Sequence, residues 1–340
     1  MINTYFSGKD WLIENPNNLG MSAEKLSALS PIIKSEYSNL SGIVVVKNGC
    51  IVFEEYYNGY GQNDPQHVAS VTKSILSALV GIAIHKGYIK STDEKVVHFF
   101  PEYDIADFCE CGQSVTIQNL LTMTAPYPFD NFHEPLDMLC TSLDWVKYTL
   151  DMLGRDGNIG DFKYSTAGAH LLSAIITQST GKSAREFANE HLFEPMGMRA
   201  IPNYKMEAFD YENLFGSKVM GWVSDPSGNS TGGWGLTLTP RDMARFGLLY
   251  LNQGVWNGNQ IIPETWIRES TALNNHNYGY MWWLINDEDI FAYAAMGDGG
   301  NTICCIPEKS LVVAIASEFI MNPRDRWTFI KEHILSALQE

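Results

Sequence analysis

The residues best suited to chemistry lie in the tetrapeptide Ser-Val-Thr-Lys at residues 70–73. Ser70 begins a long apolar stretch that ends at His85 and predicts a buried helix. Because residues i and i+3 of a helix share one face, the Ser70 hydroxyl and the Lys73 amine would meet one turn apart. The N–H groups and positive dipole end of a helix N-terminus favour the negative charge that develops when serine attacks an acyl carbon. The tetrapeptide therefore predicts a nucleophile beside a base.

The same Ser-x-x-Lys spacing occurs at residues 22–25 and 179–182. Ser22 is typical of an N-cap, and Ser179 lies at a helix end just before a glycine. Only Ser70 precedes an apolar helix long enough to belong to the core. Taken alone, the motif at Ser70 fits a capping serine followed by a surface lysine equally well.

A second motif, Tyr164-Ser165-Thr166, follows a glycine-rich loop and precedes an amphipathic helix. A tyrosine hydroxyl near Lys73 could take a proton from the serine and return it to a leaving group. The alternative is a plain helix start, with Ser165 or Thr166 as the cap.

A third motif, Gly-Asp-Gly-Gly-Asn at residues 297–301, lies between two apolar segments that predict strands. Glycines such as Gly300 let a backbone approach a ligand closely. A backbone N–H on the following strand could then form an oxyanion hole with the N–H of Ser70. A tight hairpin turn explains the Asp-Gly pair equally well.

Three further features of the sequence do not identify catalytic groups. Residues 228–232 match the Gly-x-Ser-x-Gly of a nucleophile elbow, but that motif requires a strand before it and a helix after it. We expect a flexible loop there. His67 lies three residues before Ser70 and could contact the site, but no histidine is predicted as the base. Cys109 and Cys111 have no matching pair at zinc spacing, so neither a metal nor a cofactor is expected.

Composition bounds the class of protein. The chain has 340 residues, 45% hydrophobic and 18% charged, which predicts a large packed core. Its formal net charge of −16 argues against binding nucleic acid or an anionic membrane. Neither a signal peptide nor a run of about 18 apolar residues is present. The six cysteines form no disulfide framework, so reduced thiols and a cytoplasmic location are expected.

The elements that position these motifs follow from patterning. Asn48-Gly49 between the apolar segments 42–47 and 51–57 predicts a β-hairpin. Thr239-Pro240 predicts the start of a helix that runs to about Asn252. Further helices are expected at 22–35, 71–85, 116–123, 143–153, 167–179, 184–191 and 323–338, strands at 278–285, 290–296, 301–306 and 311–317, and irregular loop at 197–235.

A hairpin near the start and strands near the end predict an α/β (α+β) fold with one sheet built from both termini. The strands should be antiparallel, because short turns join them. The helical block between them would be an inserted, mainly helical domain at residues 66–234, with the sheet domain at 1–65 and 235–340. An active site is expected at the interface, where the Ser70 helix begins.

The order of the three motifs resembles the serine β-lactamase and penicillin-binding-protein superfamily. The closest likeness is to its class C-like branch, which includes carboxylesterases, D-aminopeptidases and 6-aminohexanoate-dimer hydrolases. Residues 232–250, 256–263 and 278–283 resemble that branch too, and the likeness spans about residues 22–338. It implies a β-lactamase/transpeptidase-like fold, with helices flanking the antiparallel sheet.

The resemblance also implies roles by position. Ser70 would be acylated, with Lys73 as its general base. Tyr164 would relay the proton to the leaving group and help to activate the deacylating water. The backbone N–H groups of Ser70 and Asn301 would form the oxyanion hole.

Two positions depart from the family pattern. Thr166 stands where the motif often ends in Asn, whose amide contacts the lysine and the substrate. Asp298 stands where β-lactamases and penicillin-binding proteins usually have Lys or His to help hold the substrate carboxylate. Because like charges repel at close range, low β-lactamase and carboxypeptidase activity is expected.

The sequence therefore predicts a serine hydrolase that forms an acyl-enzyme with a small ester or amide. One alternative is a β-lactamase-like sensor or binding module without turnover, and another is a structural protein on a degenerate fold. Sensors of this kind usually carry a membrane anchor, and none is seen. The intact Ser70, Lys73 and Tyr164 favour catalysis over both alternatives.

Overall fold

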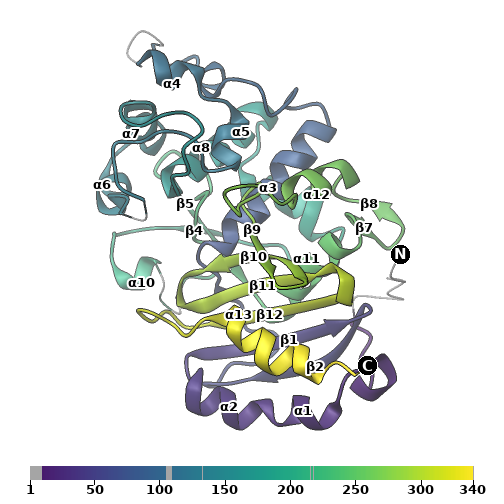
Figure 1. Cartoon of the computed structure of the whole chain (residues 1–340). Coiled ribbons are helices and arrows are strands. Elements are labelled where there is room, and N and C mark those ends of the chain that lie inside the picture. Colours follow the sequence, from purple (N-terminus) through teal and green to yellow (C-terminus); the bar gives the residue numbers. More distant parts are fainter. Residues whose placement is uncertain (1–9, 105–108, 132, 215, 217, 340) are drawn as a thin grey trace.

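One antiparallel sheet organises the molecule. The computed structural model describes residues 10–104, 109–131, 133–214, 216 and 218–339, so the expected lack of a leader at residues 1–9 lies outside it. A six-stranded sheet has the order β2-β1-β12-β11-β10-β9, and each neighbouring pair is antiparallel. Its strands are β1 (Leu40–Lys47), β2 (Cys50–Tyr56), β9 (Trp283–Asp287), β10 (Ile290–Gly297), β11 (Asn301–Ile306) and β12 (Leu311–Ser317). The predicted fold, a sheet built from both termini, is confirmed (Figure 1).

The first hairpin forms as its turn predicts. Asn48 and Gly49 join β1 to β2 with φ values of 51° and 85°. Both values are positive, as a two-residue turn needs if it is to follow the twist of the strands.

Both faces of the sheet are buried, because side chains alternate along each strand. On β1, Val44 and Val46 belong to one core cluster, and Ile43 and Val45 belong to another. A one-residue slip would exchange the two sets, so the register of this strand is strongly specified.

Helices cover the two faces separately (Figure 1). One face carries α1 (Ala23–Ser27), α2 (Leu29–Glu36) and α13 (Arg326–Phe329), which continues in irregular turns to Ala337. The other face packs against α11 (Pro240–Leu251) and α3 (Val71–His85), two helices that form where the sequence predicts them.

The helix expected over residues 22–35 is interrupted at Ala28. Pro31 explains the break, because a proline lacks the N–H that would bond to residue 27 and its ring clashes with that carbonyl. The C-terminal helix begins at Arg326, with Asp325 as its N-cap, and not near residue 323.

The helical region lies between β2 and β9 in the chain. Its helices are α4 (Glu110–Ser114), α5 (Ile117–Leu121), α6 (Leu136–Thr141), α7 (Trp145–Met152), α8 (Thr166–Thr180) and α9 (Ala184–Ala188). Thr116 caps α5 in a capping box with Asn119. Helices α4 and α6 were not predicted, because five or six residues are too few to show a helical period.

Two expectations for the later chain need correction. The strand expected from residue 278 begins at Trp283, because Met281 has a φ of 60°, which breaks the extended chain. The segment 197–235 is largely irregular, but it contains β4 (Asn203–Lys205), α10 (Tyr211–Leu214) and β5 (Trp222–Ser224).

The sheet and the helical region share one core. Cluster members include Ile303 of β11, Ile75 of α3 and Leu172 of α8. Strands β3 (Gln66–His67) and β6 (Thr237–Leu238) pair with each other near the two expected domain boundaries, and those boundaries stay a prediction. The remaining elements are β7 (Val255–Trp256), β8 (Asn259–Gln260) and α12 (Glu264–Ser270). Of the helices in the described residues, none combines the length and hydropathy that a membrane span requires.

Candidate active site

A strained turn holds Ser70 at the start of α3. Ser70 is the half-buried N-cap of this helix, and the preceding Ala69 has a φ of 48°. Alanine rarely adopts this left-handed conformation, and such strain often marks functional sites. The Thr72 hydroxyl donates to the Ala69 carbonyl at 2.7 Å, and the Val68 N–H donates to Leu236 O at 3.0 Å. These bonds fix the turn that presents the serine.

Lys73 lies in the core beside that serine. Its side chain is 1% exposed, and its Nζ is 3.1 Å from Ser70 Oγ, as the i, i+3 spacing predicts. The same Nζ donates to Thr166 Oγ1 at 3.2 Å and to the Gly233 carbonyl at 2.9 Å. These bonds orient the amine toward the serine oxygen with no carboxylate bonded to it directly.

Tyr164 lies against Lys73, immediately before α8. Lys73 Nζ is 4.6 Å from the centroid of the tyrosine ring, and Trp283 stacks on that ring with a centroid distance of 5.8 Å. The Tyr164 N–H donates to Asn131 Oδ1 at 2.9 Å. The ring is therefore held by contacts with both Lys73 and Trp283.

The second motif starts a helix, as its alternative interpretation predicted. Ser165 is the N-cap of α8 and accepts a hydrogen bond from the Gly168 N–H at 2.8 Å. Thr166, the first residue of the helix, bonds to Lys73 through its hydroxyl. Thr166 thus makes the lysine contact that the family pattern gives to an asparagine.

A glycine pair that the sequence analysis left without a role brings a carbonyl to Lys73. A Cβ on Gly233 would lie 2.5 Å from Thr166 Cγ2, and one on Gly232 would lie 2.0 Å from Ala169 O. Only glycine fits where the two backbones come this close. The two adjacent glycines were therefore the feature of the sequence that could have indicated this approach of the backbone to α8.

The Gly-x-Ser-x-Gly segment is not the flexible loop that we expected. Ser230 is 1% exposed, and its hydroxyl accepts the Arg185 N–H at 3.0 Å. The Ser173 hydroxyl donates to Ser230 O at 2.6 Å. This segment is packed against α8, and it leads directly into the glycine pair.

At the end of β10, the backbone of Gly297 lies close to the turn that carries Ser70. A Cβ there would lie 2.4 Å from Val68 O and 3.0 Å from Ser70 N. Strand β9 pairs with β10 only as far as Ala294, so among the described strands the last residues of β10 have one unpaired edge. Backbone groups on that edge lie beside the nucleophile.

The rest of the third motif forms the hairpin between β10 and β11, as its alternative interpretation predicted. Asn301 pairs with Gly297, and its side chain donates to Asp298 O at 2.8 Å and accepts from Ser317 N at 3.0 Å. The side chain of Asp298 is exposed. The role of the Asn301 N–H in an oxyanion hole stays a prediction.

A buried arginine supports this hairpin from behind. Arg326 is 4% exposed and donates to the carbonyls of Gly299 and Gly300 at 3.3 and 3.1 Å, and to Asn39 Oδ1 and Ser317 Oγ at 3.1 Å each. Burial lowers the pKa of the Arg326 guanidinium to about 10. No pattern in the sequence predicted this role of Arg326.

Glu134 is a second residue that the sequence analysis missed. Its carboxylate accepts the N–H groups of Thr166 at 2.6 Å and Ala167 at 2.7 Å, and the Ser165 hydroxyl at 3.2 Å. Burial raises the pKa of Glu134, although these bonds and the charge of Lys73 act in the opposite direction. The carboxylate thus fixes the start of α8, which carries Thr166 and follows Tyr164.

We expect Glu134→Gln to lower kcat/KM by about 10- to 100-fold, because bonds to a charged acceptor contribute about 1.5–3 kcal/mol. Both carboxylate oxygens of Glu134 accept a backbone N–H, so the NH₂ group of a glutamine would bring a donor against one of these donors. Protonation of Glu134 should have the same effect as the substitution. Wild-type activity should therefore fall as the pH is lowered, with a midpoint above the ordinary pKa of a glutamate, because burial raises the pKa of this carboxyl. A pH–rate profile should show this acidic limb in wild type and not in the variant. Unchanged kinetics in Glu134→Gln, or an equal loss in the exposed control Asp137→Asn, would contradict the assignment.

His67 has a structural contact in this region. Its Nε2 accepts the Gly235 N–H at 3.0 Å, and burial lowers its pKa to about 3. A ring held neutral, with Nε2 already bonded, agrees with the prediction that no histidine is the base.

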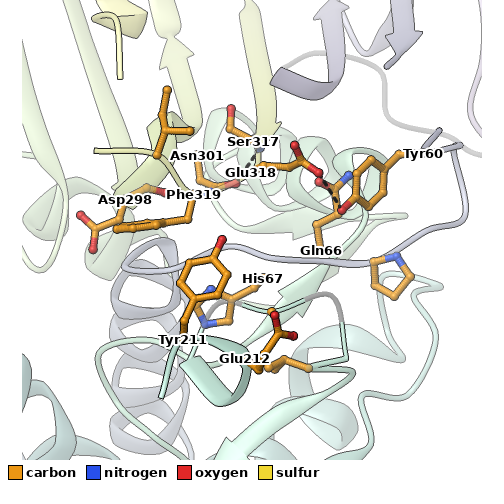
Figure 2. A pocket seen from close by; sticks show the side chains of 14 residues that line it. Tyr60, Gln66, His67, Tyr211, Glu212, Asp298, Asn301, Ser317, Glu318 and Phe319 are labelled. Carbon is orange, nitrogen blue, oxygen red and sulfur yellow. Dashed lines mark hydrogen bonds between the residues drawn. The ribbon is translucent and has the colours of Figure 1, made fainter. Parts of the chain in front are cut away.

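A pocket of about 320 Å³ adjoins these residues (Figure 2). It shares Asp298 and Asn301 with the third motif, and His67 with the segment that leads to Ser70. Ser70 is not among its lining residues, so the pocket adjoins the segment before the nucleophile and does not enclose the nucleophile itself.

Known proteins resemble this chain in sequence. Residues 37–325 match the family model described as Beta-lactamase. The 6-aminohexanoate-dimer hydrolase of Paenarthrobacter ureafaciens is 24% identical over 320 residues, which cover 86% of this chain and 76% of that protein.

Solved structures share the fold. A putative 6-aminohexanoate-dimer hydrolase from Bacillus anthracis has a TM-score of 0.70 and 21% identity, covering 96% of this chain and 89% of that one. A class C beta-lactamase has a TM-score of 0.68 and 15% identity, covering 93% and 96% of the two chains.

Proposed function

This chain belongs to the beta-lactamase family, and we propose that it is a serine hydrolase that forms an acyl-enzyme on Ser70 with a small ester or amide. The observation that carries the proposal is the 3.1 Å contact between Ser70 Oγ and the Nζ of a buried lysine. Lysine amines are rarely buried in proteins, because removing the charged form from water is costly. The burial of Lys73 therefore indicates a role beyond that of an ordinary surface lysine. Such a contact supports proton transfer from the hydroxyl to the amine.

In the proposed reaction, Lys73 takes the proton of Ser70 as Oγ attacks the acyl carbon. The tetrahedral intermediate collapses when the leaving group departs with a proton that Tyr164 relays from Lys73. Water then attacks the ester on Ser70, passes its proton to the same pair, and releases the acid with the serine restored. The contact between the Tyr164 ring and Lys73 keeps this tyrosine close to the amine with which it would exchange protons.

The oxyanion of that intermediate needs donors that are already in place. The N–H of Ser70 at the helix start is one candidate. For the second donor, the sequence suggests the N–H of Asn301. The short distance from the Cβ position of Gly297 to Ser70 N instead favours an N–H on the unpaired edge of β10 or at Asp298.

Small esters and amides are proposed as substrates because a relative is named as a hydrolase of the 6-aminohexanoate dimer. Turnover of β-lactams should be low, since the exposed Asp298 carboxylate stands where family members use a cation. A chromogenic cephalosporin should be hydrolysed with kcat/KM far below about 10⁶ M⁻¹s⁻¹. A value near that figure would show that Asp298 does not repel the substrate carboxylate.

Hydrolysis of para-nitrophenyl esters and para-nitroanilides by wild type and by Ser70→Ala tests the function. Wild type should release nitrophenol or nitroaniline, and Ser70→Ala should not. Ser77→Ala is a matched control, since Ser77 is buried on the same helix and its hydroxyl has no partner among the described residues. Turnover by Ser70→Ala at the wild-type rate would refute the proposal.

A further inference from the structure

We propose that the pocket beside Ser70 binds a positively charged amine, so that preferred substrates are esters or amides that carry an ammonium group. The inference rests on the proposed hydrolase function and adds the substrate class. Four features of the pocket support it: its position, its charge, its aromatic walls and a buried amide on its surface.

The pocket is placed for substrate. Asp298, on its wall, directly follows Gly297, whose Cβ position is 3.0 Å from Ser70 N. Gln66 and His67, also on its wall, lie in the short segment before Ser70. A group held in the pocket could therefore belong to a molecule whose acyl carbon is at the Ser70 hydroxyl.

The pocket is negatively charged. Its wall includes the carboxylates of Glu212, Asp298 and Glu318, and none of the described residues that line it is a lysine or an arginine. Within the described part of the chain, none of the three forms a salt bridge. Glu318 accepts a hydrogen bond from the neutral Tyr60 hydroxyl at 3.3 Å. The buried Arg326, which bonds to Ser317 Oγ behind the wall, offsets only part of the negative charge of the three carboxylates. A carboxylate-bearing substrate would be repelled here, and an ammonium would be attracted.

Aromatic rings form other parts of the wall. Tyr60, Tyr211 and Phe319 surround the opening in Figure 2, and the rings of Tyr211 and Phe319 have centroids 6.0 Å apart. A cation over an aromatic face is attracted by the negative face of the ring. Carboxylates alone would also suit a hydrated metal ion, whereas rings among carboxylates favour an organic ammonium.

A buried amide on the pocket wall has an open donor. Gln66 is 7% exposed, and its Oε1 accepts the Ser41 hydroxyl. Its Nε2 has no partner among the described residues. In Figure 2 its side chain extends between Tyr60 and Glu318. Buried amides are nearly always bonded. Because this nitrogen is itself shielded from solvent, a carbonyl or hydroxyl of an amine-bearing substrate would bond to it after a small shift of the pocket wall.

The test compares substrates that differ only in charge. One set is para-nitrophenyl esters of matched acyl chains that end in ammonium, methyl or carboxylate. The other places the charge in the leaving group, with acetylcholine against its uncharged isostere neohexyl acetate. The ammonium member of at least one set should exceed its neutral partner in kcat/KM by about tenfold or more, equivalent to about 1.4 kcal/mol. The carboxylate member should be the poorest, and added salt should shrink the preference.

The double variant Glu212→Gln/Glu318→Gln assigns the preference to the pocket. Its ratio of ammonium to neutral kcat/KM should fall toward one. Glu308→Gln, which removes an exposed carboxylate at the other end of β11, should keep the wild-type ratio. Equal turnover of charged and neutral substrates, or a preference that persists in the double variant, would overturn the inference.

Failure of the hydrolase function is distinguishable from failure of the pocket. If no substrate is turned over, binding of butylammonium chloride to Ser70→Ala is measured by calorimetry, with butanol as the neutral reference. Binding of the amine that the double variant loses would support the pocket. Absence of binding, or binding that the double variant retains, would overturn it.

Discussion

Lys73→Met lowers kcat/KM for every substrate by about 10³-fold or more in our account, because it removes the base beside Ser70. Methionine keeps the length of the buried stem, so the packing of α3 against α8 should survive. The variant leaves the Gly233 carbonyl without its donor, which costs about 1–3 kcal/mol, but it also removes a desolvated amine. The folded state should therefore persist.

Steady-state kinetics and a thermal melt check this expectation together. Lys86→Met is the matched control, because Lys86 is exposed at the other end of the same helix. The control should keep wild-type activity. A folded Lys73→Met protein with more than about a tenth of wild-type kcat/KM would show that another group deprotonates Ser70.

Tyr164→Phe should reduce turnover by about 10²–10⁴-fold on amides, the usual contribution of general acid–base catalysis. Phenylalanine keeps the ring contacts with Lys73 and Trp283 and removes only the hydroxyl. The loss should be much smaller on para-nitrophenyl esters, because nitrophenolate departs without a proton. The ratio of the two losses therefore reports proton relay to the leaving group.

Tyr278→Phe is the control for that experiment. Tyr278 packs edge-on against Tyr164, with a centroid distance of 6.1 Å, and is 2% exposed. Its hydroxyl has no role in the proposed reaction, so both substrates should be hydrolysed at near wild-type rates. Equal losses on amides and esters in Tyr164→Phe would mean that the tyrosine positions Lys73 and does not relay protons.

The parts of the fold and site that the sequence predicts depend on spacings of a few residues. The contact of Ser70 with Lys73 follows from one helical turn, and the turn at Asn48-Gly49 follows from two positive φ values. We predicted one continuous helix over residues 22–35, although Pro31 is a local signal for the observed break. Local patterns suffice where the interaction is itself local.

Contacts between distant segments were not predictable from such patterns. Glu134 reaches the start of α8 from a loop 32 positions earlier, and the Gly233 carbonyl meets Lys73 across 160 positions. Arg326 supports the hairpin at Gly299 and Gly300 from the last helix. A lone acid, glycine or arginine in a loop carries no pattern, so only the folded chain reveals these roles.

Intact-protein mass spectrometry after treatment with a fluorophosphonate probe tests most directly whether Ser70 is an activated nucleophile. Wild type should gain the mass of one adduct, and peptide mapping should place it on Ser70. Ser70→Ala should gain none, and Lys73→Met should react far more slowly. A folded wild-type protein without an adduct, or an adduct that persists in Ser70→Ala, would contradict the account and favour a binding module without turnover.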